Sequence, residues 1–187
     1  MYSGESQVNI ARLNLSEFRW EGNWGVSGDY VQRYVVDLML MRLGRWLRLL
    51  GQDVALPEGE SDEELLRQAA GENRTVITRD KRLSQACPGA GVRCLLIRSS
   101  EISDQLREMA EAGVALQLDP RRCTVCNGPL EETRTSGEKK WQCRSCQKIY
   151  WRGGHWQKME ETLESICKED KSRMERNSSY IFSPDPR

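Results

Sequence analysis

Two closely spaced cysteine pairs, Cys123/Cys126 and Cys143/Cys146, limit what the second half of this chain can fold into. The pairs are of the Cys-x2-Cys type and are separated by sixteen residues, a spacing typical of a four-thiolate zinc site. Four reduced cysteines without a metal are the weaker alternative, because so small a segment has little core and needs a staple. Four protein ligands leave no open coordination position, so the pattern predicts a structural zinc ion.

The residues around the cysteines predict a zinc ribbon. A turn should follow each pair, and Asn127-Gly128 suits the first turn because glycine tolerates unusual backbone angles. Gln147-Lys148 lacks a glycine and is a weaker match to the second turn. Two short aromatic and apolar segments are expected to be strands of this ribbon: 141–142 and 149–151.

Upstream of the cysteines, short apolar segments alternate with helical patterns. Four segments are predicted as strands: 34–36, 54–56, 75–78 and 92–97. Helices are predicted at four places: 38–50, from Ser61, a short turn from Asp80, and about ten residues from Ser103. Ser61 and Glu64 have the spacing of a capping box. Strands that alternate with helices predict an α/β fold, a mostly parallel sheet with helices on both faces.

The two ends of the chain show weaker patterns. Residues 1–32 are polar and Gly-rich and are expected to be an extension outside the main fold. A last helix is expected from about His155 to Cys167, before a charged and then Ser/Pro-rich segment with the composition of a disordered tail. The predicted organisation is an extension, an α/β domain, a zinc ribbon and a helical, then disordered tail: 1–32, 33–118, 119–160 and 161–187.

The overall charge gives no argument for nucleic acid or membrane, because 28 Lys and Arg balance 28 Asp and Glu. The longest apolar run, 38–50, is interrupted by three arginines, so no membrane span is expected. The first thirty residues lack a signal-peptide pattern. We therefore expect a cytoplasmic protein with reduced cysteines and no membrane partner.

Three aspartates follow predicted strands of the sheet. Asp37 directly follows the first strand, Asp62 begins the helix after the second, and Asp80 lies just beyond the third. The carboxyl ends of parallel strands meet at one edge, and clustered carboxylates repel each other unless a cation lies between them. Asp62 and Asp80 alone would be explained as helix-start residues. Together, the three acids predict a magnesium or manganese site with oxygen ligands.

Several ordered segments resemble a known family. They are YVVDLML (34–40), LGRWLRLLG (43–51), SDEELL (61–66), TRD (78–80), the two cysteine pairs and KIYWRGGHW (148–156). This pattern, which extends over about residues 33–159, resembles the Mut-seven C-terminal RNase domain family. The resemblance implies a PIN-like nuclease fold with an attached zinc ribbon, and metal-dependent hydrolysis of RNA. It also implies that Asp37, Asp62 and Asp80 are the catalytic acids that hold the magnesium or manganese ion.

Two departures from that family pattern affect the expected number of ions. Many PIN nucleases have another acid just after the Thr-x-Asp motif, where this chain has Lys81 and Arg82. The glutamate that PIN domains usually carry on an early helix is not evident, unless Glu63 or Glu64 replaces it. We therefore expect one tightly held ion rather than a two-metal site.

Basic residues near the acids and in the ribbon are candidate RNA contacts. The predicted contacts are Arg42, Arg45, Arg48, Lys148, Arg152 and His155. The three arginines recur at helical spacing after Asp37, although a solvated or salt-bridged helix face explains that spacing equally well. His155 is the single histidine of the chain; proton transfer and phosphate contact are open to it, but a structural role is favoured.

Aromatic residues interleave with the basic residues of the ribbon, as they do in proteins that stack single-stranded bases. Some of these aromatics must form the core of so small a ribbon, and we expect Trp151 or Trp156 to pack. The expected partner is therefore single-stranded RNA, and the sequence names no protein partner.

The main hypothesis is a ribonuclease with a structural zinc ion and a catalytic magnesium or manganese ion. The alternative is a non-catalytic zinc-ribbon RNA-binding protein with a degenerate nuclease site, which the absent acid leaves open. A phosphotransfer enzyme with Asp37 as nucleophile is disfavoured, because Met39 stands where the haloacid-dehalogenase type has a second Asp. A glycine-rich phosphate loop is also absent from the sequence.

Overall fold

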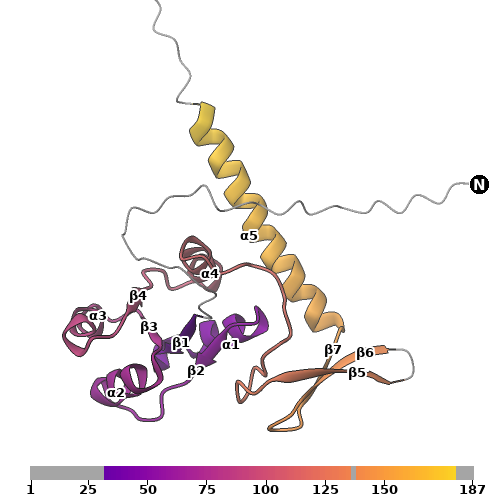
Figure 1. Cartoon of the computed structure of the whole chain (residues 1–187). Coiled ribbons are helices and arrows are strands. Elements are labelled where there is room, and N and C mark those ends of the chain that lie inside the picture. The colour runs from indigo at the N-terminus through magenta and orange to yellow at the C-terminus, as the bar shows by residue number, and fades with distance from the viewer. Residues whose placement is uncertain (1–31, 136–137, 180–187) are drawn as a thin grey trace, which may run out of the picture. The chain divides into compact units, whose positions relative to one another are not determined.

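Residues 32–135 and 138–179 are described by the computed structural model of the chain (Figure 1). The expected N-terminal extension, up to residue 31, lies outside the described residues, and so does the end of the expected tail, residues 180–187. No helix in the described part of the chain is long and apolar enough to cross a membrane.

Four short strands form one sheet in the order β2-β1-β3-β4. The strands are β1 (Arg33–Val36), β2 (Asp53–Ala55), β3 (Thr75–Thr78) and β4 (Cys94–Leu96). All three pairings are parallel, and Tyr34 of β1 is in register with Val54 of β2 and Thr75 of β3. The predicted parallel sheet is therefore confirmed, although β4 is shorter than the apolar run that predicted it.

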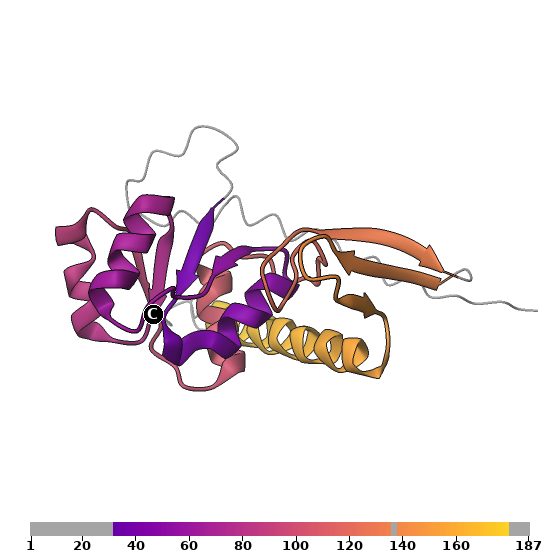
Figure 2. The ribbon, with the colours of Figure 1, turned by 90° about the horizontal axis from the view of Figure 1, so that it is seen from below.

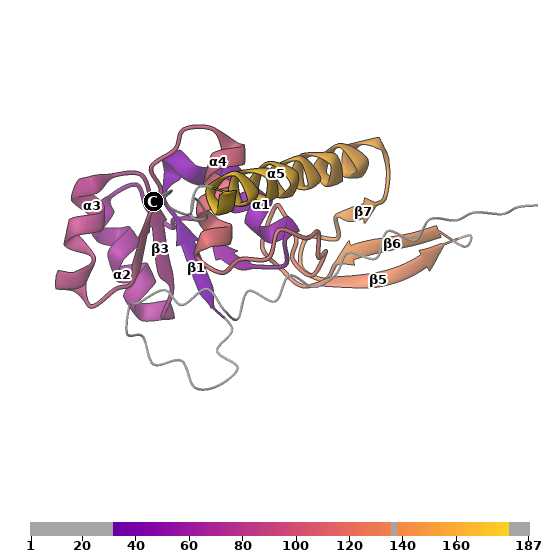
Figure 3. The same ribbon diagram turned by 90° about the horizontal axis from the view of Figure 1, so that it is seen from above.

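Helices follow each strand and cover both faces of the sheet (Figure 3). They are η2 (Leu38–Leu40), α1 (Met41–Leu49), α2 (Asp62–Glu72), α3 (Lys81–Ala86), η3 (Pro88–Ala90) and α4 (Ile102–Glu111). The predicted capping box is present, because the Ser61 side chain accepts from Glu64 N–H and the Glu64 side chain accepts from Ser61 N–H. The predicted helix from residue 38 begins as the 3-10 turn η2 and continues as α1.

Successive residues of β1 belong to two separate hydrophobic clusters, because side chains alternate between the faces of a strand. Val36 packs with α1 and α4 through residues such as Leu47 and Met109. Val35 packs with α2 and α3 through Leu65 and Leu83. The strands are apolar on both faces and are covered on both, as a parallel sheet requires.

The cysteine-rich segment contains a second, antiparallel sheet in the order β5-β6-β7. Its strands are β5 (Leu130–Thr135), β6 (Glu138–Cys143) and β7 (Ile149–Trp151). Strands were predicted at 141–142 and 149–151, and β6 and β7 contain them. The polar sequence of β5 gave no strand prediction, and this strand pairs with β6 over its whole length.

The last helix, α5 (Gly154–Ser179), is longer than the predicted helix at 155–167. Trp156 stacks on Trp141 of β6 with ring centroids 5.5 Å apart. Further along the helix, Leu163 and Ile166 join the hydrophobic cluster of the α/β sheet. Figure 2 shows α5 running from the end of β7 toward α4, so no structural break separates the ribbon from a tail near residue 160.

Candidate functional site

Asp37 and Thr78 lie side by side at the carboxyl ends of β1 and β3. The parallel register pairs Val36 with Ile77, so the next residue of each strand also meets its neighbour. The Asp37 backbone N–H donates to the Ile77 carbonyl (2.9 Å), and the Thr78 hydroxyl donates to Asp37 Oδ2 (2.7 Å). Because Thr78 is fully buried, it fixes the position of the half-buried Asp37 carboxylate.

Asp80 is joined to the same hydroxyl. Its backbone N–H donates to Thr78 Oγ1 (2.9 Å), so Thr78 contacts both aspartates of the edge. Asp80 is also the N-cap of α3, where its Oδ1 accepts from the N–H groups of Arg82 (2.6 Å) and Leu83 (3.4 Å). Within the described residues, neither Asp37 Oδ1 nor Asp80 Oδ2 accepts a hydrogen bond, so each acid keeps one oxygen available to a ligand.

Asp62 is the first residue of α2 and is exposed. No hydrogen bond joins it to Asp37 or Asp80 in the part of the chain that the structure describes. Among residues 32–135 and 138–179, the cysteine quartet is the one group of three or more metal-ligating residues whose ligand atoms lie within 4.8 Å of one another. The structure thus links Asp37 and Asp80 through Thr78 and does not bring Asp62 into a tight cluster with them.

Glu64, one of two replacements considered for the early-helix glutamate of PIN domains, is engaged in capping α2. Its Oε2 accepts from the N–H groups of Glu60 and Ser61 (both 3.1 Å) and from the Ser61 hydroxyl (2.9 Å). These bonds hold the pKa of the Glu64 carboxyl below its usual value. Glu63 is exposed, and the described residues offer it no hydrogen-bond partner.

Several exposed basic residues follow Asp37 or flank Asp80 in the chain. Five cations on α1, in the β3–α3 turn and on α3 are exposed and have no ion pair among the described residues: Arg42, Arg45, Arg79, Lys81 and Arg82. The sequence analysis noted two of them, Lys81 and Arg82, only because they stand where many PIN nucleases have a further acid. It did not count them as possible phosphate contacts. The signal was their position as the first two residues of α3, directly after Asp80.

The four cysteine sulfurs gather in one cluster in the ribbon. Sγ atoms of Cys123 and Cys146 are 3.5 Å apart, as are those of Cys126 and Cys143. Burial opposes ionisation of Cys123, but the Tyr150 hydroxyl, 3.1 Å away, and nearby N–H groups lower the pKa of its thiol to about 6. Burial among the other sulfurs raises the pKa of Cys126 to about 12. A zinc ion fits this all-sulfur donor set, because it would compensate thiolates held this close together.

The two cysteine turns have the same backbone geometry. Asn127 N–H donates to the Cys123 carbonyl (2.9 Å), and Gln147 N–H donates to the Cys143 carbonyl (3.0 Å). Asn127 and Gln147 have φ angles of 61° and 62°, in the left-handed region. The second turn therefore forms without the glycine whose absence made it the weaker sequence match.

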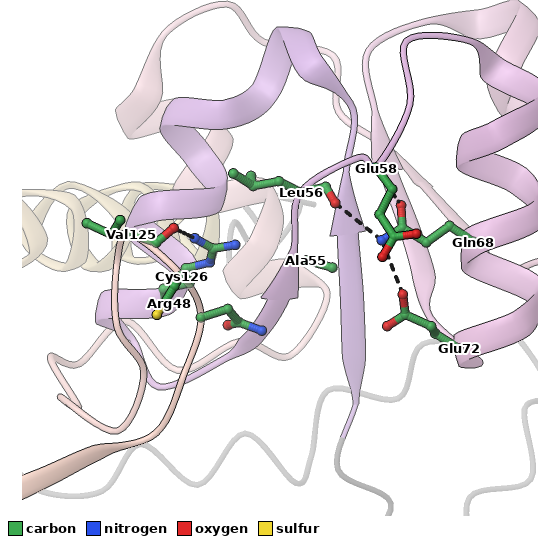
Figure 4. A pocket seen from close by; sticks show the side chains of 9 residues that line it. Arg48, Ala55, Leu56, Glu58, Gln68, Glu72, Val125 and Cys126 are labelled. Carbon is green, nitrogen blue, oxygen red and sulfur yellow. Dashed lines mark hydrogen bonds between the residues drawn. The ribbon is translucent and has the colours of Figure 1, made fainter. Parts of the chain in front are cut away.

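Arg48, a predicted RNA contact, is buried in the structure. It is 2% exposed, and its guanidinium donates to three backbone carbonyls: Val54 (2.8 Å), Thr124 (3.0 Å) and Val125 (3.0 Å). Figure 4 shows Arg48 directed at the Val125 carbonyl. Burial lowers the pKa of Arg48. The side chain joins the first cysteine turn to the edge strand β2 of the α/β sheet.

Asn127 completes this junction from the ribbon side. Its Oδ1 accepts from Val54 N–H (3.1 Å), so Asn127 and Arg48 together satisfy the outward N–H and C=O of Val54. Its Nδ2 donates to Asp53 Oδ1 (2.8 Å). Edge strands expose unpaired backbone groups, and here the first cysteine turn covers that edge of the sheet.

Asp53 is the anionic centre of the junction. Arg74 donates to its Oδ1 (2.7 Å) and Arg122 to its Oδ2 (3.2 Å), while Arg33 lies 3.5 Å from Oδ2. Burial raises the pKa of Asp53, but hydrogen bonds from Arg74 and Asn127 outweigh it and leave the pKa below its usual value. Sequence reasoning missed Asp53, because one aspartate after a helix and a glycine carries no motif.

A pocket of about 300 Å³ lies beside this junction, lined by residues from β2 and the segment after it, from α2 and from the first cysteine turn (Figure 4). Its lining includes Arg48, Leu56, Gln68 and Cys126. Gln68 spans it, donating to the Leu56 carbonyl and to Glu72 Oε1 (both 3.2 Å). Because none of the three candidate acids lines this pocket, it is separate from the candidate nuclease site.

The remaining predicted RNA contacts lie at the surface. Lys148, Arg152 and His155 are all exposed. The Arg152 guanidinium lies over the Trp156 ring, 5.4 Å from its centroid. Of the two tryptophans expected to pack, Trp156 is buried and Trp151 is exposed.

Comparison with known proteins identifies the family. A model of the Mut7-C RNAse domain matches residues 32–163, which include the α/β sheet, the cysteine ribbon and the first part of α5. No curated protein and no solved structure matches the chain. Because the matched region is more than half of the 187 residues, the chain belongs to the Mut7-C RNAse domain family.

Proposed function

We propose that this protein is a divalent-metal-dependent ribonuclease whose catalytic acids are Asp37, Asp62 and Asp80. The observation that carries the proposal is the Thr78 hydroxyl, which donates to Asp37 and accepts from the Asp80 backbone at the carboxyl edge of a parallel sheet. Ligand sites of open α/β sheets form at this edge. The family match supports a nuclease and RNA as its substrate class.

Asp37 and Asp80 would hold a magnesium or manganese ion through the oxygens that Thr78 and the α3 N-terminus leave available. Asp62 begins α2 and, being exposed, would supply an outer ligand or orient a metal-bound water. When bound, the ion would lower the pKa of an attacking water and offset charge on the phosphate. One ion is expected, because Lys81 and Arg82 occupy the positions of a further acid.

The exposed cations around the edge would contact the RNA backbone. Arg42 and Arg45 on α1 and Arg79, Lys81 and Arg82 around Asp80 provide positive charge near the acids. Phosphate contacts of this kind position the chain without reading its sequence. The cysteine ribbon would hold structural zinc, and its surface residues Lys148, Arg152 and His155 would add RNA contacts. A reducing cytoplasmic location would suit its thiolates.

The test uses the full chain and a labelled single-stranded RNA in magnesium or manganese. Asp37→Asn and Asp80→Asn should each lower the cleavage rate by at least about a hundredfold, because each removes a charged metal ligand. Asp104→Asn is the matched control, because Asp104 is a partly exposed acid on α4 that pairs with Arg107, and it should cleave normally. Zinc content is measured for every variant, so that loss of the ribbon is not mistaken for loss of the catalytic ion.

The same experiment distinguishes a ribonuclease from a non-catalytic RNA-binding protein. Cleavage that persists in both Asp37→Asn and Asp80→Asn would rule out the assigned acids. RNA that is bound but left intact by the wild-type protein, in magnesium and in manganese, would favour the non-catalytic RNA-binding alternative.

A further inference from the structure

The ribbon sheet has one covered and one open face. On the covered face, Trp141 is in register with Tyr150 and packs against Trp156 and Met159 of α5. Side chains alternate along a strand, so the neighbours of Trp141 and Tyr150 lie on the other face. These are Ile149 and Trp151 of β7, which are 48% and 62% exposed.

Cross-strand register defines what surrounds the exposed aromatic ring. Trp151 is directly opposite Lys140, and Lys140 is opposite Thr133. In the next row, Ile149 is opposite Gln142, which is opposite Glu131. Glu131 pairs with Arg144, so its charge is compensated. The open face therefore combines one large exposed aromatic side chain with a facing lysine and polar residues.

The backbone supports the Trp151 ring. A Cβ atom placed on Gly153 would lie 3.0 Å from the indole Nε1 and 3.3 Å from Cδ1. The edge of the ring therefore rests against the chain where it turns toward α5, which limits the orientations of the ring. An aromatic side chain held in this way loses little conformational entropy when a flat ligand stacks on it.

We propose that the open face of the ribbon sheet, centred on Trp151, is a stacking site for one base of single-stranded RNA. Trp151 provides the aromatic surface, Ile149 extends it with apolar area, and Lys140 lies where it can offset charge on the adjoining phosphates. Proteins that hold single strands without sequence preference combine aromatic platforms and basic side chains in this way. The site rests on the proposed function for its ligand class but does not depend on hydrolysis.

The experiment measures RNA affinity by fluorescence anisotropy with a dye-labelled oligouridine. All proteins carry Asp37→Asn, so that the RNA stays intact. Trp151→Ala should weaken binding by roughly 5- to 150-fold, the loss that corresponds to one base–aromatic stack. Trp151→Phe should retain most of the affinity, whereas Trp151→Leu, which keeps apolar area without the ring, should bind as weakly as Trp151→Ala.

A second RNA distinguishes stacking from a general surface effect. An oligonucleotide with abasic residues keeps the phosphates and lacks the bases. The protein that retains Trp151 should bind this abasic oligonucleotide weakly. Trp151→Ala should not weaken that binding further, because there is no base to stack. Zinc content and thermal unfolding of each variant check that the ribbon is intact.

Three results would overturn the inference. The first is equal RNA affinity with Trp151 and with Trp151→Ala, and the second is full RNA affinity of Trp151→Leu. The third is that Trp151 holds two copies of the chain together in solution, while the dimer and the separated monomers bind RNA equally well. Failure of the proposed hydrolysis is measured separately, with the protein that keeps Asp37. It would appear as RNA that stays uncleaved. A protein that binds RNA through Trp151 and does not cleave it would support the stacking site alone.

Discussion

The side-chain oxygen of Asn127, in the first cysteine turn, accepts a hydrogen bond from the backbone N–H of Val54 in the edge strand of the α/β sheet. The same amide group donates to Asp53. Asn127 thus makes two contacts to β2 and directly follows Cys126, one of the four clustered cysteines that could bind zinc. We therefore expect the stability of the α/β sheet and metal binding by the cysteine cluster to be linked at this residue.

Asn127→Gly should destabilise the protein by about 1–3 kcal/mol, because it removes both hydrogen bonds and leaves the buried Val54 N–H without an acceptor. Glycine is chosen because it adopts the positive φ of this position without strain. Gln147→Gly is the matched control in the second turn and should change stability by no more than about 0.5 kcal/mol, since Gln147 is exposed. Chemical denaturation measures both, and equal effects would contradict a special role for Asn127.

Removal of zinc should expose the Val54 amide to solvent while the centre of the sheet stays protected. Without the metal the first cysteine turn loses its order, and with it the acceptor of the Val54 N–H. The Val76 N–H, which donates to the Arg93 carbonyl between β3 and β4 (2.9 Å), is the internal control. Hydrogen exchange with and without zinc reports both amides. Unchanged protection of Val54 in the metal-free protein would contradict the link.

Arg48→Met should lower the stability of the protein, whereas Arg45→Met should lower its affinity for RNA, although both residues lie on α1. Arg48→Met removes three hydrogen bonds to backbone carbonyls at a buried site and should cost about 2–4 kcal/mol. Arg45 is exposed, so Arg45→Met should leave stability unchanged and weaken RNA binding. Denaturation curves and anisotropy titrations separate the two. Weaker RNA binding by a stable Arg48→Met protein would restore Arg48 as an RNA contact.

Thr78→Val should lower the cleavage rate about 10- to 100-fold and weaken the apparent affinity for manganese. The hydroxyl that orients Asp37 and accepts from Asp80 is replaced by a methyl group of similar size. Thr78→Ser keeps the hydroxyl and should restore most of both. Rates at several manganese concentrations give the two quantities.

Thr75→Val in the same strand is the control for Thr78→Val. Among the described residues, Thr75 Oγ1 is a buried side-chain oxygen without a hydrogen-bond partner. Replacing it by a methyl group should therefore stabilise the protein by about 1 kcal/mol and leave the manganese dependence unchanged. Similar kinetic losses in Thr75→Val and Thr78→Val would indicate a general effect on β3.

Asp53 should contribute less to stability as the solution is acidified. Its pKa is lowered in the folded protein relative to the usual value of about 3.9. Its ionised form therefore stabilises the fold fully above the unfolded pKa, and this contribution is lost as the pH falls through the folded pKa. The difference in unfolding free energy between wild type and Asp53→Asn should be constant above about pH 5 and shrink below about pH 4. A difference independent of pH would show that the charge of Asp53 is not what matters.

The alternating strands and helices were predicted well from the sequence, because the signals that mark them are local. The strand at Thr75–Thr78, the Ser61–Glu64 capping box and the cap at Asp80 all depend on residues close together in the chain. The cysteine spacing likewise predicted the four-sulfur cluster. The Thr78 bridge was missed, although Thr78 belongs to the TRD segment at 78–80, because its partners become apparent only when β1 and β3 are set in register.

Residues that join the two sheets could not be assigned from the sequence. Arg45 and Arg48 have the same type and a helical spacing, and periodicity alone does not say which one is buried. The partners of Arg48 are Thr124 and Val125, more than seventy residues away. The full length of α5 was also missed, because its second half has the charged composition of a disordered segment.

The packing of α5 has a consequence for how this chain acquires its structure during synthesis. Leu163 and Ile166 fill part of the hydrophobic cluster that covers one face of the α/β sheet. All four strands of that sheet emerge from the ribosome well before these two residues do. Until the ribbon and the first turns of α5 have been synthesised, the hydrophobic cluster on one face of the sheet therefore lacks these two side chains. We expect this enzyme to complete its folding late in translation rather than one half at a time, unlike chains whose N-terminal domains fold first.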